Sequence, residues 1–105
     1  MGNVHQGEIL ELSDKNLTIL VLSRDFFNAS GLAVVCPVVD RADPDALHIK
    51  IEISPGVVRT ALVEQLKSLD LHARYYKTCG RIDFSQIQDI SDAVQGIFDY
   101  YPFSI

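Results

Sequence analysis

The sequence has no long apolar run and only two cysteines. No stretch of about 18 apolar residues occurs in the chain, so no segment is predicted to cross a membrane. The first residues contain neither a basic segment nor the apolar core of a signal peptide, which leads us to expect a cytoplasmic protein. Cys36 and Cys79 lack metal-binding spacing. We expect two reduced thiols, Cys36 buried in an apolar run and Cys79 in a loop.

Basic residues are also few. Lysine and arginine number 9 against 14 aspartates and glutamates, and the net charge of −5 argues against broad attraction to nucleic acid. The segment from Arg59 to Arg81 is different, because it contains five basic residues and only two acidic ones, Glu64 and Asp70. A local basic segment can bind a polyanion at one face, and an ordinary solvated surface has the same pattern, so both interpretations stay open.

The length and composition fit one domain spanning residues 1–105. Of these residues, 48% are apolar, which is enough for a single modest core. A domain of this size buries roughly 60–70% of the surface of its unfolded chain, so it would gain stability from a partner.

Strands are predicted to dominate the first forty residues. β-Branched and apolar segments predict strands over 7–12, 17–23 and 32–39. The turn cluster over 13–16 joins the first two strands as an antiparallel hairpin. Asp25 is placed to cap a helical turn within 24–30. Pro37 indicates an edge or a bulge position, because proline has no N–H to donate to a neighbouring strand.

The second half is predicted to continue the sheet and to end in a helix. Residues 47–53 alternate, with the apolar side chains facing the core and His48, Lys50 and Glu52 facing out. One or two strands are expected over 57–71, and a basic loop over 72–83. A helix is predicted over 85–101 from an apolar stripe formed by Ile87, Ile90, Val94, Ile97, Phe98 and Tyr101. The order predicts a mainly β fold, a small barrel or rolled sheet with a helix packed on it.

Several short motifs then occur in a fixed order between residues 7 and 75. They are Gly7-Glu8-Ile9, Leu20-Val21-Leu22-Ser23 followed by Asp25 and Phe27-Asn28, Val34-Val35-Cys36-Pro37, and the segment from Thr60 to Asp70. As an ordered set they resemble the MazF/PemK toxins (growth inhibitors) of toxin–antitoxin systems, and the stretch from Val63 to Asp70 is the most specific.

The resemblance implies a CcdB/Kid-like, SH3-like barrel of about five to seven strands with a C-terminal helix. It also implies a homodimer, a cognate antitoxin, and sequence-specific cleavage of single-stranded RNA without a metal or another cofactor. In that reaction the ribose 2′-hydroxyl attacks the neighbouring phosphate. The protein must therefore remove one proton, supply another and stabilise the phosphate charge.

Two positions depart from the family pattern. Leu17 stands where the family commonly has an arginine, and Val39 stands where it has a serine or threonine. Neither side chain can carry a proton or bind a phosphate oxygen. Three hypotheses follow: an endoribonuclease toxin that uses other groups, a non-cutting family member that binds nucleic acid or a protein, and an unrelated small barrel used for interaction.

Three residues are the catalytic candidates. His48 titrates near neutral pH and can act as an acid or a base. Glu64 matches a family aspartate and can act as a base, although an ion pair with Lys67 or Arg59 would make it purely structural. Arg24 follows the second predicted strand and can bind a phosphate through two hydrogen bonds, unless it is only a surface arginine in a turn.

The RNA-binding candidates lie in the basic segment. Arg59 and Thr60 can hold a phosphate, unless they are only solvated residues at a strand edge, and Lys67 and Ser68 match an Arg-Ser pair of the family. An aromatic ring beside Arg74 can stack on a base, and because neighbouring strand residues face opposite ways, only one of two adjacent tyrosines can do so. The complete set is Arg59, Thr60, Gln65, Lys67, Ser68, Arg74 and Tyr75.

Overall fold

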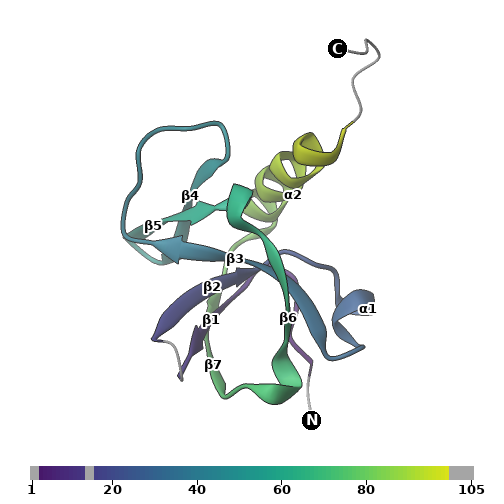
Figure 1. Ribbon diagram of the computed structural model, residues 1–105. Helices are drawn as coiled ribbons and strands as arrows, with labels where there is room; N and C mark the ends of the chain where they lie inside the picture. Colours follow the sequence, from purple (N-terminus) through teal and green to yellow (C-terminus); the bar gives the residue numbers. More distant parts are fainter. Residues whose placement is uncertain (1–2, 14–15, 100–105) are drawn as a thin grey trace.

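The computed structural model describes residues 3–13 and 16–99 (Figure 1). Its elements are β1 (Glu8–Leu12), β2 (Leu17–Val21), α1 (Asp25–Asn28), β3 (Leu32–Val39), β4 (His48–Ser54), β5 (Val57–Leu62), the 3-10 turn η1 (Val63–Gln65), β6 (Lys67–Asp70), the 3-10 turn η2 (Leu71–Ala73), β7 (Tyr76–Arg81) and α2 (Phe84–Phe98). The predicted mainly β fold with a C-terminal helix is confirmed. The centre of the predicted first turn, residues 14 and 15, lies outside the described residues.

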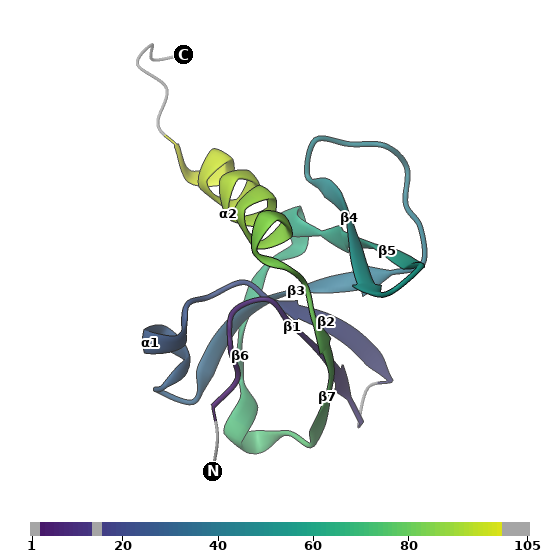
Figure 2. The ribbon, with the colours of Figure 1, turned by 180° about the vertical axis from the view of Figure 1, so that it is seen from behind.

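Strand β3 is the centre of the sheet. All strand pairs are antiparallel, and the order is β4-β5-β3-β2-β1-β7, with β6 also paired to β3. Along β3, residues 32–35 pair with β6 and residues 38–39 pair with β5. Because two strands share β3 at different points, the sheet curls: β4 and β5 form a hairpin at one end, and β6 closes over the other (Figures 1 and 2).

Pro37 does not lie on an edge strand, so the edge alternative of that prediction is wrong. It faces Ile19 of β2 in the middle of the sheet. On the other side of β3, Pro37 falls between the residues paired with β6 and those paired with β5. The change of partner removes the need for an N–H at this position, which explains how a central strand accommodates proline.

The two faces of the sheet carry separate cores. Successive side chains of a strand point to opposite faces of the sheet. On one face they pack between strands β1–β3 and the strands β6 and β7, and this is the first core. On the other face they pack beneath α2 and the β4–β5 hairpin, and this is the second core. Ile51, at 0% exposure, and the partly buried Ile49 and Ile53 follow the predicted inward pattern. Cys36 belongs to the second core, as predicted, and burial raises the pKa of its thiol to about 12.

Helix α2 begins at Phe84, one residue before the predicted start. The Asp83 carboxylate accepts a hydrogen bond from the backbone N–H of Gln86 at 2.9 Å and caps the helix. Ile87, Ile90 and Val94 pack on the core. Beyond them the helix points away from the sheet (Figure 2), and Phe98 is exposed. No helix in the described part of the chain is long and apolar enough to cross a membrane. The predicted stripe residue Tyr101 lies outside that part.

The predicted loop over residues 72–83 is wrong, because half of it, Tyr76–Arg81, forms β7. This strand pairs with β1 along its length. Lys77, Thr78 and Cys79 are exposed, so the segment lacks the apolar alternation from which a strand is recognised. Cys79 is therefore a free thiol on an edge strand and not in a loop.

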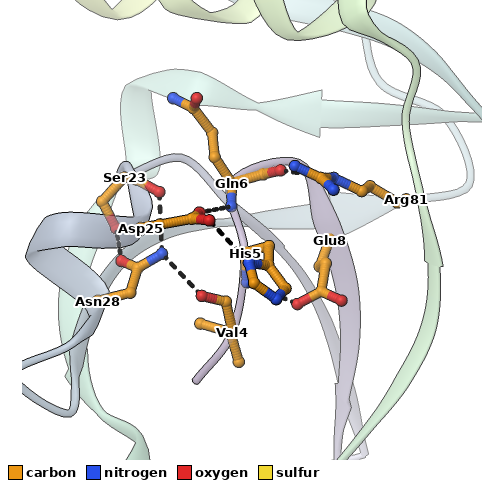
Figure 3. A network of polar contacts seen from close by, with 8 residues as sticks. All are labelled: Val4, His5, Gln6, Glu8, Ser23, Asp25, Asn28 and Arg81. Atoms are coloured by element: carbon orange, nitrogen blue, oxygen red, sulfur yellow. Dashed lines mark hydrogen bonds and ion pairs between the residues drawn. The ribbon is translucent and has the colours of Figure 1, made fainter. Parts of the chain in front are cut away.

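Asp25 does not cap helix α1. The N-cap is Arg24, with no side-chain hydrogen bond. Figure 3 shows that the Asp25 carboxylate instead contacts the N-terminal segment, through His5 Nδ1 at 2.7 Å and the backbone N–H of Gln6 at 3.1 Å. Nearby, the Asn28 amide donates to the carbonyls of Val4 and Ser23. The corner after β2 therefore fastens the N-terminal segment to the sheet.

Candidate active site

A histidine–glutamate pair joins the β4–β5 hairpin to the turn that follows it. His48 opens β4 opposite Leu62, and Glu64 follows two residues later in η1. His48 Nε2 lies 2.9 Å from Glu64 Oε2, and Nδ1 lies 2.6 Å from the carbonyl oxygen of Asp43. Among the ion pairs of the described residues, Glu64 is joined to His48 and not to Arg59 or Lys67, so the alternative partners are wrong.

The surroundings favour the charged form of both groups. Each nitrogen of the His48 ring faces an oxygen acceptor, so the Asp43 carbonyl and then Glu64 raise the pKa of His48. The hydrogen bond from His48 lowers the pKa of Glu64. The side chains of His48 and Glu64 are 18% and 37% exposed. Neighbouring residues thus cover most of the His48 side chain, which was predicted to face out. Both side chains of the pair nevertheless keep some contact with solvent.

A hollow of about 320 Å³ lies beside this pair, and we call it the His48 hollow. His48, Lys50 and Thr60 line it together with the loop residues Asp43 and Asp45. Lys50 lies opposite Thr60 in the β4–β5 pairing and two residues from His48, so all three share one face of the hairpin. An ammonium group, a hydroxyl and the His48 imidazole therefore line one hollow, and Glu64 contacts it through His48.

One of the two apolar substitutions, Val39, lies next to this hollow. Val39 pairs directly with Thr60, and Thr60 pairs with Lys50. Val39, Thr60 and Lys50 thus form one line across three strands, which we call the cross-strand row. On the other side of β3, the pairing with β2 ends at Ile19 and Pro37, and Leu17 and Val39 each lie two residues beyond that last pair. Sequence reasoning missed Lys50; its outward position beside His48 in the alternating strand was the available signal.

Arg59 and Thr60 do not point to one site. Arg59 faces Ile51 in the β4–β5 pairing, on the side of the hairpin away from Thr60. Its Nε lies 3.0 Å from Asp40 Oδ1, and the two line a different hollow. Within one chain the two side chains thus lie on different faces of the hairpin, and their binding of a phosphate stays a prediction.

Arg24 lies far from the His48–Glu64 pair. It precedes α1, at the end of the sheet opposite the β4–β5 hairpin (Figures 1 and 2). Its guanidinium carbon lies 5.3 Å from the centre of the Phe26 ring, a cation–π contact at the surface. Within one chain Arg24 is not placed to act with His48 and Glu64.

The remaining RNA-binding candidates are dispersed. Gln65 is exposed in η1 beside Glu64. Lys67 and Ser68 are exposed on β6, opposite Val35 and Val34, and so point to different sides. Arg74 and Tyr75 lie after η2, at the other end of β3.

No group of three or more histidine, cysteine, aspartate or glutamate residues that could hold a metal ion occurs in residues 3–13 and 16–99. The functional groups of the site are the Glu64 carboxylate, the His48 imidazole, the Lys50 amine and the Thr60 hydroxyl.

Comparison with solved structures gives the same fold. The chain superimposes on MazE–MazF (Form-I) from Deinococcus radiodurans with a TM-score of 0.82 and 21% identity, covering 93% of this chain and 98% of that one. MazF (Form-I) from the same organism gives 0.80 and 19%, with 93% and 98% covered. The Mycobacterium tuberculosis toxin MazF-mt6 gives 0.73 and 14%, with 90% and 100% covered. At these identities the likeness concerns the fold.

Membership of a family is shown by the sequence itself. No curated protein matches the chain. The family described as the PemK-like, MazF-like toxin of type II toxin–antitoxin systems matches residues 11–98, which is most of the 105 residues. The chain belongs to this toxin family.

Proposed function

We propose that this chain is the toxin of a type II toxin–antitoxin pair and that it cleaves single-stranded RNA without a metal ion. The observation that carries the proposal is the cross-strand row. Thr60 supplies a hydroxyl directly beside Val39, and Lys50 supplies a cation on the next strand, near one of the two positions where the family's usual groups are replaced by apolar ones. Neighbouring side chains thus replace the chemistry that the substitutions removed.

In the proposed reaction, Glu64 accepts the proton of the ribose 2′-hydroxyl through Oε1, the carboxylate oxygen that faces away from the His48 contact. The 2′-oxygen forms a bond to phosphorus and the bond from phosphorus to the 5′-oxygen breaks, which leaves a 2′,3′-cyclic phosphate. The His48 imidazolium gives its Nε2 proton to the departing 5′-oxygen. Lys50 stabilises the charge on the phosphate in the transition state.

A second candidate function is a non-cutting toxin relative that binds RNA or a protein. Two observations favour it. Thr60 is only 6% exposed, which limits its contact with a substrate. The acidic residues Asp43 and Asp45 also line the His48 hollow and repel a phosphate.

The two candidates are separated by a cleavage assay on single-stranded RNA in the presence of a chelator. The first predicts cleavage by the unaltered protein, with a loss of about 100-fold or more in Glu64→Gln and His48→Asn. Because Lys50 stabilises the phosphate charge, Lys50→Ala should lower the rate. Lys77→Ala, which changes an exposed lysine on β7, is its matched control and should leave the rate unchanged. Cleavage that survives both changes at Glu64 and His48 would overturn the assigned roles.

The second candidate predicts no cleavage by the unaltered protein and cleavage by the double variant Leu17→Arg, Val39→Thr. If a folded, dimeric sample of that double variant also leaves every tested RNA intact, the site does not support RNA cleavage in either form.

We also propose a cognate antitoxin and a homodimer as partners. The first solved structure above contains MazE together with MazF, and this chain shares its fold. An acidic, disordered antitoxin segment would suit the exposed basic residues of this chain. Co-expression with the short reading frame next to the toxin gene should relieve growth arrest, and light scattering should give twice the mass of one chain. Cytoplasmic location stays a prediction.

A further inference from the structure

We propose that a second hollow, at the opposite end of β3, binds the phosphate and sugar of a nucleotide. We call it the Arg74 hollow. It measures about 190 Å³ and opens where the N-terminal segment passes the link between β6 and β7, which lie together in both views (Figures 1 and 2). The ligand is either a free mononucleotide or one nucleotide of an RNA chain, and the second source rests on the proposed function.

The floor of this hollow is rigid. Val4 and Leu71, both buried, contribute its apolar part. Asn28, at 2% exposure, lies at its base and is held by the carbonyls of Val4 and Ser23. Figure 3 shows these contacts between the N-terminal segment and the corner after β2. Because the Asn28 amide is already engaged, it shapes the hollow and does not bind the ligand.

A histidine is fixed at the rim by close packing on a glycine. Gly31 has φ of +93°, and a Cβ built there would lie 2.2 Å from Cε1 of His72. The backbone reinforces this position, since the N–H of Leu71 donates to the carbonyl of Gly31 at 3.0 Å and that of His72 donates to Asp70 Oδ1 at 3.0 Å. The absence of a side chain at position 31 thus gives the imidazole its place beside the hollow.

The side chains around the hollow suit an anion. Arg74 brings a positive charge, His72 lines the hollow beside it, and none of its lining residues among those the structure describes is acidic. This separates it from the His48 hollow, which two aspartates line. An arginine presents a planar fork of N–H donors that matches two phosphate oxygens. Tyr76, half-buried on the same wall, offers a ring against a sugar or base.

The position of the hollow makes it distinct from the proposed cleavage site. Gly31 lines it, and Val39 of the cross-strand row lies eight residues further along the chain, roughly 25 Å away at about 3.3 Å per strand residue. A single RNA would have to run along the sheet to reach both. The Arg74 hollow would then hold a nucleotide several positions from the bond that is cut.

The test is a titration followed by amide NMR signals, with uridine and adenosine monophosphate, inorganic phosphate, and a 2′-O-methyl RNA that cannot be cleaved. The proposal expects saturable shifts at Gly31, His72 and Tyr76 with the mononucleotides, and weaker binding of phosphate alone. Arg74→Ala should weaken mononucleotide binding about tenfold or more, Arg74→Lys by less, and the loop variant Arg41→Ala not at all. The amide spectrum of each variant shows whether it is folded.

The remaining outcomes of the titration either overturn the proposal or identify the ligand. If the signals of the hollow do not move at millimolar mononucleotide, or if Arg41→Ala weakens binding as much as Arg74→Ala, the proposal is overturned. Equal binding of phosphate and mononucleotides overturns the nucleotide assignment. If the RNA moves only signals of β4 and η1 while mononucleotides move those of the hollow, the ligand is a free mononucleotide. Cleavage that persists without any binding here rejects this inference and leaves the proposed function standing.

Discussion

His48 acquires its environment from three segments that are separate in the sequence. The loop before β4 provides the carbonyl of Asp43, the turn after β5 provides the carboxylate of Glu64, and the β5 pairing sets Lys50 beside Thr60. From the sequence, His48 and Glu64 could be selected as titratable candidates, but their contact could not, because it depends on the register of β4 against β5. Arg59 and Thr60, which the sequence alone had joined, are separated because neighbouring residues of β5 face opposite ways.

The stability of the protein should depend on pH through His48. Its folded pKa is raised above the unfolded value of 6.5, so its contribution is fully present below about pH 6.5 and is lost as the pH rises through the folded pKa. The pKa of Glu64 is lowered from 4.5, so that contribution is present above pH 4.5 and is lost at lower pH. Lys50 and the carboxylates of Asp43 and Asp45 also line the hollow that His48 faces.

Urea unfolding at a series of pH values, for the unaltered protein and for His48→Gln, measures the contribution of His48 to stability. The difference in unfolding free energy should be largest between about pH 4.5 and 6.5 and should shrink toward pH 8.5. A difference that grows with rising pH would contradict the charged histidine pair.

A second prediction concerns two of the three glycines with left-handed backbone. Gly31→Ala should lower the unfolding free energy by about 2–4 kcal/mol, because an alanine is strained at φ of +93° and its Cβ would also overlap the His72 ring. Gly56→Ala is the matched control, since φ is +77° there but no atom lies within 4 Å of the added Cβ. It should lose only about 1 kcal/mol. Equal losses in urea unfolding would show that His72 does not pack on Gly31.

At the scale of elements, the accuracy of the sequence prediction followed the burial of each segment. Strands β1 to β4 and helix α2 each bury an apolar face, and their patterns predicted them to within a few residues, whereas β5 and β6 were expected only as one or two strands over 57–71. Strand β7 was missed because it lies at the edge of the sheet with Lys77, Thr78 and Cys79 in solvent. Its position is determined by pairing with β1, a long-range contact that leaves little trace in the local sequence.

The cap of α2 gives a prediction at this scale. Asp83→Ala should lower the unfolding free energy by about 1 kcal/mol, because it removes the acceptor for the Gln86 N–H at the helix start. The pKa of Asp83 is lowered by that hydrogen bond and by the Ser85 hydroxyl, so acid should reproduce part of the loss. Asp89→Ala, at an exposed position within the same helix, is the control. A loss as large in the control would show that general charge effects, and not capping, are responsible.

At the scale of the whole molecule, β3 connects two ends with different chemistry. One end carries the His48–Glu64 pair and the cross-strand row, and the other carries the Arg74 hollow. The basic segment seen in the sequence does not form one face, because Arg59 pairs with Asp40 and Arg81 donates to the carbonyl of Gln6. The curl of the sheet distributes these charges, so an RNA bound as proposed would follow β3 and not a continuous basic surface.

The two free cysteines report on the integrity of this central strand. Cys36 lies in β3 with 0% exposure and a pKa raised to about 12, whereas Cys79 is exposed on β7. In the native protein a thiol reagent should therefore modify Cys79 alone, and it should do so slowly at neutral pH, since the pKa of Cys79 is also raised, mainly by desolvation. Reaction of Cys36 requires the core beneath α2 and the β4–β5 hairpin to open, so in Cys79→Ser its rate should follow global unfolding and rise with denaturant. Mass spectrometry counts the modified thiols over time, and Cys36→Ser, which leaves only the exposed thiol, provides the reference rate. Rapid modification of Cys36 without denaturant would mean that this core opens locally, and β3 would then lack the rigid packing that connects the cross-strand row with the Arg74 hollow.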